Sequence, residues 1–127
     1  MFGLLWREKN LSNNKTMRIV FNRIIPFKGY YAMCLWPFVF VRKEIQSRYG
    51  EVTENHERIH GEQQKELLVL PFLLWYGAEW LVGLIRYRNA SKAYRSISFE
   101  QEAYINQYDL EYLKGRRRFS WAKYVFK

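Results

Sequence analysis

The sequence contains a single cysteine, Cys34, and only two histidines, His56 and His60. A lone cysteine excludes an intrachain disulfide, and on that ground we expect a reducing compartment. The apolar stretch 1–6 is too short for the core of a secretory signal, and no small-residue cleavage site follows it. We therefore expect a cytoplasmic protein, either free or associated with the inner membrane.

Acidic residues are also scarce, because 12 Asp and Glu stand against 21 Lys and Arg, for a formal net charge of +9. The basic excess lies at the two ends of the chain, whereas the stretch 51–79 is acidic. Basic ends can attract anionic lipid or nucleic acid. The sequence shows no recognised nucleic-acid-binding signature, so a nucleic-acid partner is not expected. A basic membrane-surface or nucleic-acid module stays open as an alternative interpretation.

The composition does not indicate disorder. Apolar residues make up 49% and aromatic residues 19% of the 127 positions, which is enough for one hydrophobic core. The polar run Asn10–Lys15 predicts a loop. We therefore expect residues 1–16 to form a flexible tail and residues 17–127 to form a single domain.

Two short apolar runs precede the first helical pattern. Ile19–Ile25 is rich in β-branched residues and predicts a strand, and the turn residues 26–29 follow it. Phe38–Val41 predicts a second strand, at a sheet edge because Pro37 cannot donate to a ladder. We therefore expect a short N-terminal β-hairpin.

From Thr53, an expected N-cap, the pattern becomes helical. At 100° per residue, one face carries His56, Ile59, His60, Gln63, Leu67 and Leu70. Pro71 is expected to end or kink this helix. A third helix is expected after Ser98, with Ser91 as the alternative cap, and it should end at Lys114–Arg118.

The second expected helix, Phe72–Tyr87, lies in an unusually apolar part of the chain. The stretch 67–85 contains Glu79 as its only charged residue, and its length could cross a bilayer. Gly77 and Glu79 interrupt it, however, and carboxylates within membranes are costly. Two interpretations stay open, a buried core helix and a membrane-embedded or interfacial helix, so membrane association through 67–85 is one expectation.

Both histidines belong to one motif, His56-Glu57-Arg58-Ile59-His60. Histidines at i and i+4 of a helix project from the same face about one turn apart, which matches two corners of a zinc tetrahedron. A glutamate beside the first histidine can take a proton from zinc-bound water. We therefore predict a zinc site with His56 and His60 as ligands and Glu57 as the general base.

No third histidine exists, so the third protein ligand should be a carboxylate. Three residues are candidates, Glu79, Glu100 and Glu102. Glu79 is the only charge in an apolar helix and requires a partner. Glu102 projects about 200° away from Glu100 around a helix, so the two cannot face the same metal ion. The residues alone leave this choice open.

Residues 56–104 resemble the core of the gluzincin metallopeptidases, most nearly the CAAX prenyl protease/HtpX group, the BlaR/MecR sensor peptidases and small bacterial minigluzincin-like proteins. Their shared outline is HExxH, an apolar segment, and a helix with Glu three residues before a small residue and four before Asp. Here Glu100 and Ala103 match that outline. The resemblance implies Glu100 as the third ligand, and an edge strand such as Phe38–Val41 that pairs with substrate.

The chain departs from the family pattern at Tyr104, which stands where the family has an aspartate that orients a ligand histidine. Gln63 or Glu66 could replace that aspartate from the first helix. Tyr104, Tyr76 or Tyr108 could also steady an oxyanion, and Glu79 could support the site from the second helix.

Together these features predict an α+β minigluzincin-like protein, with a short N-terminal β-hairpin followed by three helices and zinc between the first and third. Residues 17–127 would then be one metallopeptidase-like domain that hydrolyses a peptide or protein substrate. The alternative is a zinc-binding structural or regulatory domain without turnover.

Overall fold

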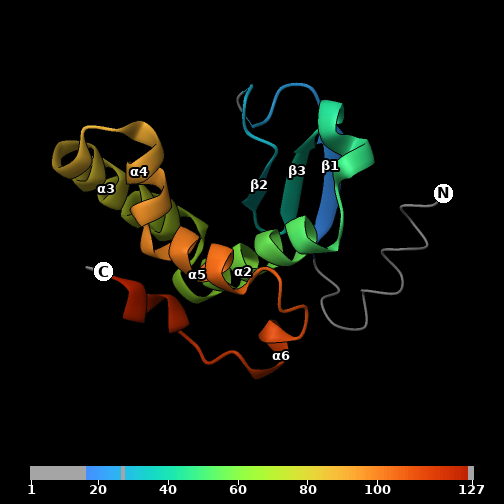
Figure 1. Ribbon diagram of the computed structural model, residues 1–127. Coiled ribbons are helices and arrows are strands. Elements are labelled where there is room, and N and C mark those ends of the chain that lie inside the picture. Colours follow the sequence, from blue (N-terminus) through green and yellow to red (C-terminus); the bar gives the residue numbers. More distant parts are fainter. Residues whose placement is uncertain (1–16, 27, 126–127) are drawn as a thin grey trace.

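The computed structural model describes residues 17–26 and 28–125 (Figure 1). The expected tail, residues 1–16, lies outside the described residues. The elements are β1 Arg18–Asn22, β2 Ala32–Leu35, β3 Phe38–Arg42, the 3-10 helix η1 Lys43–Arg48, α2 Glu51–Leu67, α3 Val69–Tyr87, α4 Ala90–Ser96, α5 Ser98–Asn106, α6 Tyr112–Gly115 and the 3-10 helix η2 Ser120–Tyr124. The fold is α+β, as predicted, with a small sheet followed by helices.

The sheet has three strands in the order β1-β3-β2. Strands β2 and β3 form an antiparallel hairpin, whereas β1 pairs with β3 in parallel. The prediction of Phe38–Val41 as an edge strand was therefore wrong, because β3 is the central strand. Pro37 lies in the turn before β3, where its missing N–H removes no ladder bond, and its carbonyl accepts from the Arg18 N–H at 2.7 Å.

The core of the sheet consists of alternate side chains of β3 packed with neighbours from the flanking elements. It comprises Met17, Cys34, Val39, Val41 and Ile45, all buried. Helix α2 approaches this core at Gly61, where an added Cβ would stand only 3.1 Å from Met17 Sδ. This close approach brings α2 against β2, and it places the HExxH motif beside the sheet.

Helix α2 begins three residues earlier than the sequence suggested, with Gly50 instead of Thr53 as its N-cap. It ends at Leu67, where Leu68 has a φ of 67° and separates it from α3. Pro71 lies in the first turn of α3, where an N–H would have no intrahelical partner. The predicted break near Pro71 is therefore confirmed, as a boundary between two helices.

The expected third helix is divided into two. Asn89 caps α4 by accepting from the Lys92 N–H at 2.9 Å. Helix α5 begins at Ser98 and ends at Asn106, so the prediction that it continues to Lys114–Arg118 was wrong. The Asn55 side chain of α2 donates to the carbonyls of Asn106, Gln107 and Asp109, and these bonds hold the chain in a turn where α5 ends.

Helices α3 and α4 pack against each other, and in Figure 1 they lie at the upper left, apart from the sheet at the upper right, with α2 and α5 between them. Gly83 makes the close approach possible, since an added Cβ would lie 2.9 Å from the Cα of Ala93. A second core joins α3, α5 and η2 and comprises Phe72, Ile97, Phe99 and Trp121. The Phe72 and Phe99 ring centroids are 4.4 Å apart.

Candidate metal centre

Most of the side chains that α2 buries are polar. They are Glu54, Asn55, His56, Glu57, His60, Gln63 and Gln64. The helix lies between β2 and α5, so these groups find partners on both sides. Toward the sheet, Gln64 donates to the Cys34 carbonyl at 2.8 Å and accepts from the Trp36 N–H at 2.6 Å. Toward α5, Asn55 donates to the Gln107 carbonyl at 2.9 Å. Since buried polar groups require partners, the two sides together fix the rotation of the helix.

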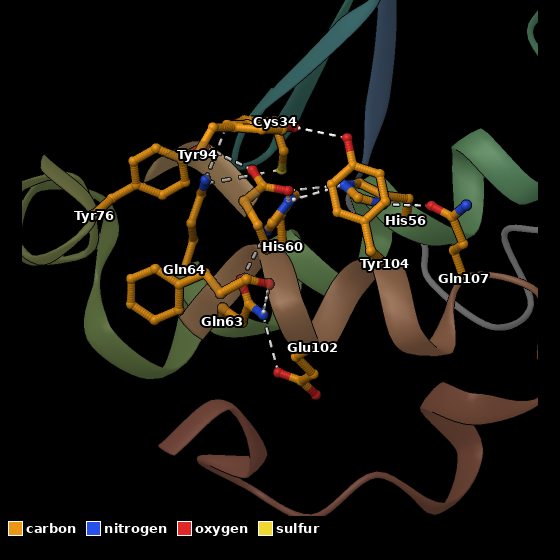
Figure 2. A network of polar contacts seen from close by, with 12 residues as sticks. Cys34, His56, His60, Gln63, Gln64, Tyr76, Tyr94, Glu102, Tyr104 and Gln107 are labelled. Carbon is orange, nitrogen blue, oxygen red and sulfur yellow. Dashed lines mark hydrogen bonds and ion pairs between the residues drawn. The ribbon is translucent and has the colours of Figure 1, made fainter. Parts of the chain in front are cut away.

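His56, His60 and Glu100 meet between α2 and α5, and all three are buried. The two histidine Nε2 atoms are 3.2 Å apart, and Glu100 Oε1 lies 3.2 Å from each of them. Glu100 comes from the first turn of α5. Figure 2 shows the two histidines meeting at the centre of the polar network. The group of three could hold a metal ion.

In each histidine, the hydrogen bond at Nδ1 determines whether Nε2 carries a proton or a lone pair. Gln63 Nε2 donates to the Phe99 carbonyl and to Glu102, which fixes the Gln63 Oε1 as the atom facing His60 Nδ1 at 2.8 Å. His60 Nδ1 must therefore carry a proton, and in the neutral ring Nε2 presents a lone pair. His56 Nδ1 faces the Gln107 Oε1 at 2.8 Å, which favours the same tautomer for this ring.

Three lone-pair-bearing atoms consequently face one another and require a proton or a cation between them. In the protein without a metal, a proton fills this role: burial opposes the charge on His60, but Glu100 raises its pKa to about 9. Burial likewise disfavours ionised Glu100, yet His60 and His56 hold the pKa of this carboxyl well below its usual range.

The spacing of the three atoms also fits a metal ion. An equilateral triangle with 3.2 Å edges is one face of a tetrahedron. The centre of that tetrahedron lies about 2.0 Å from each corner, a normal bond length between a first-row metal and imidazole nitrogen or carboxylate oxygen. Two imidazoles and one carboxylate therefore form a suitable donor set with a fourth position left for another ligand.

The residues that orient the histidines are two glutamines. Gln63 was predicted for this role, whereas Gln107 was missed although it shares a helix face with Glu100 in the sequence. Tyr104 does not bond to a histidine. Its ring packs against His56 with the centroids 4.5 Å apart, and its hydroxyl meets that of Tyr94 at 2.9 Å.

The other carboxylates considered from the sequence lie away from the two histidines. Glu79 accepts from the Ser98 N–H at 2.6 Å and from the Ser98 hydroxyl at 2.7 Å. It thereby satisfies the start of α5, where a negative charge is favoured by the helix dipole, two residues before Glu100. Glu66 forms an ion pair with Arg116 at 2.7 Å and contacts neither histidine.

Glu102 lies on the opposite side of α5 from Glu100, as the helical angle required. It accepts from Arg116 at 2.5 Å, from Tyr112 at 2.6 Å and from Gln63 at 2.9 Å. Burial would raise the pKa of Glu102, but the Arg116 guanidinium and these other donors lower it. Glu102 therefore fixes the orientation of the Gln63 amide through a hydrogen bond and does not face His56, His60 and Glu100.

Glu57 is buried beside the group, yet its Oε1 has no hydrogen-bond partner among the described residues. The backbone of Cys34 forms a hydrogen bond with the Glu57 carboxylate. Burial raises the pKa of Glu57, although His56 and His60 act to lower it. Glu57, His60 and Glu100 all line one cavity of about 600 Å³. The unpaired oxygen is therefore next to both the group and open space.

The rest of the cavity wall is mainly apolar and comes from the β1–β2 loop, β2, α3 and α4. Among the tyrosines considered from the sequence, Tyr76 lines the cavity and donates to Glu100 Oε2 at 2.7 Å. Burial, together with the charge of Glu100, raises the pKa of the Tyr76 hydroxyl. Tyr94, which the sequence analysis missed, also lines the cavity, whereas Tyr108 is exposed.

No family model, curated protein or solved structure matches this chain. The resemblance to gluzincins therefore depends on the motif itself and on the His56, His60 and Glu100 group.

Proposed function

We propose that the protein is a zinc-dependent peptidase, with zinc held by His56, His60 and Glu100 and with Glu57 as the general base. The observation that carries this proposal is the unpaired carboxylate oxygen of Glu57 in the cavity wall. A buried carboxylate oxygen without a protein partner destabilises the fold. A reaction that uses the free oxygen explains why the fold retains it.

Zinc is the metal that this donor set favours. Two imidazoles with one carboxylate and an open fourth position are typical of catalytic zinc, whereas structural zinc sites usually have four protein ligands. Zinc bound there would polarise a carbonyl oxygen and lower the pKa of a bound water. The glutamines at both Nδ1 atoms would hold the rings in the tautomer that presents Nε2 to the metal.

The residues around the cavity would then have distinct tasks. Glu57 would accept a proton at its free Oε1 and later deliver it to the leaving amine. Tyr76 has its hydroxyl in the cavity wall beside Glu100, from where it could donate to the substrate oxygen that gains charge. The apolar wall would exclude bulk water and would favour apolar side chains on the substrate.

An extended peptide could pair with β2, and not with β3 as the sequence suggested. The edge of β2 that faces away from β3 is partly covered by Gln64, which bonds to Cys34 and Trp36. Because backbone groups alternate along a strand, Ala32 presents its N–H and carbonyl on this same edge. Ala32 also lines the cavity, so a peptide added there would lie beside Glu57.

The test compares Glu57→Gln with the wild type and with Glu62→Gln, which alters an acid on the other side of α2. Zinc content is measured by elemental analysis, and cleavage is measured by mass spectrometry on a complex peptide library. We expect full zinc content in all three proteins and loss of cleavage by about 10²–10⁴ in Glu57→Gln alone. A Glu57→Gln variant that retains both zinc and full activity would rule out this mechanism.

A zinc-binding structural domain without turnover is the second candidate. It is favoured by the absence, among the described residues, of a carboxylate at Nδ1 of either histidine, since Gln107 and Gln63 occupy these two positions. The metal would then join α2 to α5 and stabilise the helical part. Full zinc content and a zinc-dependent rise in Tm, with no cleavage of any peptide by the wild type, would identify this function.

A further inference from the structure

Apolar side chains cover the outward face of α3. The exposed members are Leu70, Leu74, Trp75, Leu81, Val82 and Ile85. Helix α3 is long and apolar enough to cross a membrane by length and composition, and 11% of its most apolar 18-residue window is buried. At 1.5 Å per residue the face from Leu70 to Ile85 is about 24 Å long. A contiguous apolar surface of this length marks an interaction site.

The opposite face of α3 packs into the protein. Phe72 and Gly83 are buried, and Glu79, the only charged residue between Glu66 and Arg86, turns inward to Ser98. The outward face therefore carries no charge along its whole length. An exposed helix face that is apolar from end to end is the kind of surface that becomes buried against a partner.

Basic residues follow the apolar face directly. Arg86, Arg88, Lys92 and Arg95 are all exposed, and the sequence from 80 to 99 contains no acid. Lys and Arg near a membrane surface are attracted to anionic lipid headgroups, by about 1 kcal/mol for each residue. Trp75, which is partly exposed on α3, is of a residue type that favours the interface between hydrocarbon and water.

We infer that the outward face of α3 docks onto an anionic lipid bilayer, with the helix lying in the plane of the interface. The packing excludes a crossing of the bilayer by this fold, because α4 with Lys92 and Arg95 lies along α3 and would have to enter the hydrocarbon too. The acidic lipids complement Arg86 and Arg88 at the end of this face, and the apolar side chains enter the acyl boundary. This inference does not depend on the proposed function.

The test is flotation of the full chain with vesicles of phosphatidylcholine, with and without phosphatidylglycerol. We expect binding that is stronger to the anionic vesicles and that weakens as salt is added. Leu81→Gln combined with Ile85→Gln should lower the partition coefficient by roughly ten-fold or more, since two apolar side chains no longer enter lipid. Ile105→Gln, which alters an equally exposed apolar residue on α5, should leave the coefficient unchanged.

The charge contribution is tested separately. Arg86→Gln combined with Arg88→Gln should reduce binding to anionic vesicles by roughly ten-fold and leave binding to neutral vesicles unaltered. His60→Ala should bind vesicles as the wild type does, which separates this inference from the metal site. Three results would overturn it: absence of vesicle binding by the wild type, a soluble dimer that dissociates in the Leu81/Ile85 variant, or alkali-resistant insertion across the bilayer.

Discussion

Neutralising Glu100 and neutralising Glu102, two residues apart on α5, should have different effects on the stability of the protein. Glu100 faces the two histidines at 3.2 Å, whereas Glu102 faces Arg116 at 2.5 Å. We therefore predict that Glu100→Gln removes most of the stability that zinc adds. Glu102→Gln should lower the stability of the protein with or without zinc and leave the zinc increment intact.

The magnitudes follow from burial and from linkage. Glu102 is fully buried and the Arg116 side chain is 4% exposed, so Glu102→Gln leaves a buried guanidinium with Glu66 as its remaining carboxylate. Breaking a buried pair costs about 3–5 kcal/mol, and we expect about 3 kcal/mol because Glu66 remains. At a free zinc concentration 1,000 times Kd, the wild type should gain about 4 kcal/mol. A hundred-fold loss of affinity in Glu100→Gln reduces this gain to about 1.4 kcal/mol.

The assay is thermal unfolding of each protein in zinc and in chelator, with the difference between the two Tm values as the readout. The difference is the required quantity because Glu100→Gln also removes the ion pair with His60 in the protein without metal. A 3 kcal/mol loss corresponds to a fall in Tm on the order of 10 °C. Equal loss of the zinc increment in both variants, or retention of it in Glu100→Gln, would refute the assignment of Glu100 as a ligand.

Three further predictions concern residues that position the centre. Gly83→Ala should lower the free energy of unfolding by about 1–3 kcal/mol, because the added Cβ would stand 2.9 Å from the backbone of α4. In the control Gly77→Ala the added Cβ meets no atom within 4 Å, so this variant should be neutral or stabilising. Chemical denaturation measures both. Gln107→Leu should weaken zinc binding roughly ten-fold or more in a chelator competition, and wild-type affinity would contradict its role. Glu79→Ala should cost about 1–2 kcal/mol through loss of the bonds to Ser98, and an unchanged Tm would show that this contact does not hold α5.

Several elements of the fold could be predicted because their signals are local. The helical period around His56 and the helix-breaking effect of Pro71 indicated two successive helices, and these are α2 and α3. The sheet was less predictable. Pro37 indicated an edge strand, but its position in the turn leaves the ladder of β3 complete. Parallel pairing of β1 with β3 depends on contacts between strands 20 residues apart, which no local pattern encodes.

The candidate site, like the fold, could be predicted only in part from the sequence. The i, i+4 spacing placed His56 and His60 on one face, and the angle between Glu100 and Glu102 showed that one of them had to face elsewhere. The choice between Glu79 and Glu100 rested on a family resemblance. In the structure it follows from packing, since Glu79 is bonded to Ser98 at the start of α5 while Glu100 enters the histidine pair.

The sequence alone determined the pair of histidines, the adjacent Glu57 and the apolar character of residues 67–85, because each is a matter of residue type and helical spacing. The tertiary structure alone decided which carboxylate joins the pair and which face of α3 stays outside. It also decided that Gln107 orients His56 at 2.8 Å. The contacts of Glu100 and Gln107 with the histidines join segments about 40 to 50 residues apart, so they depend on how α2 and α5 pack together.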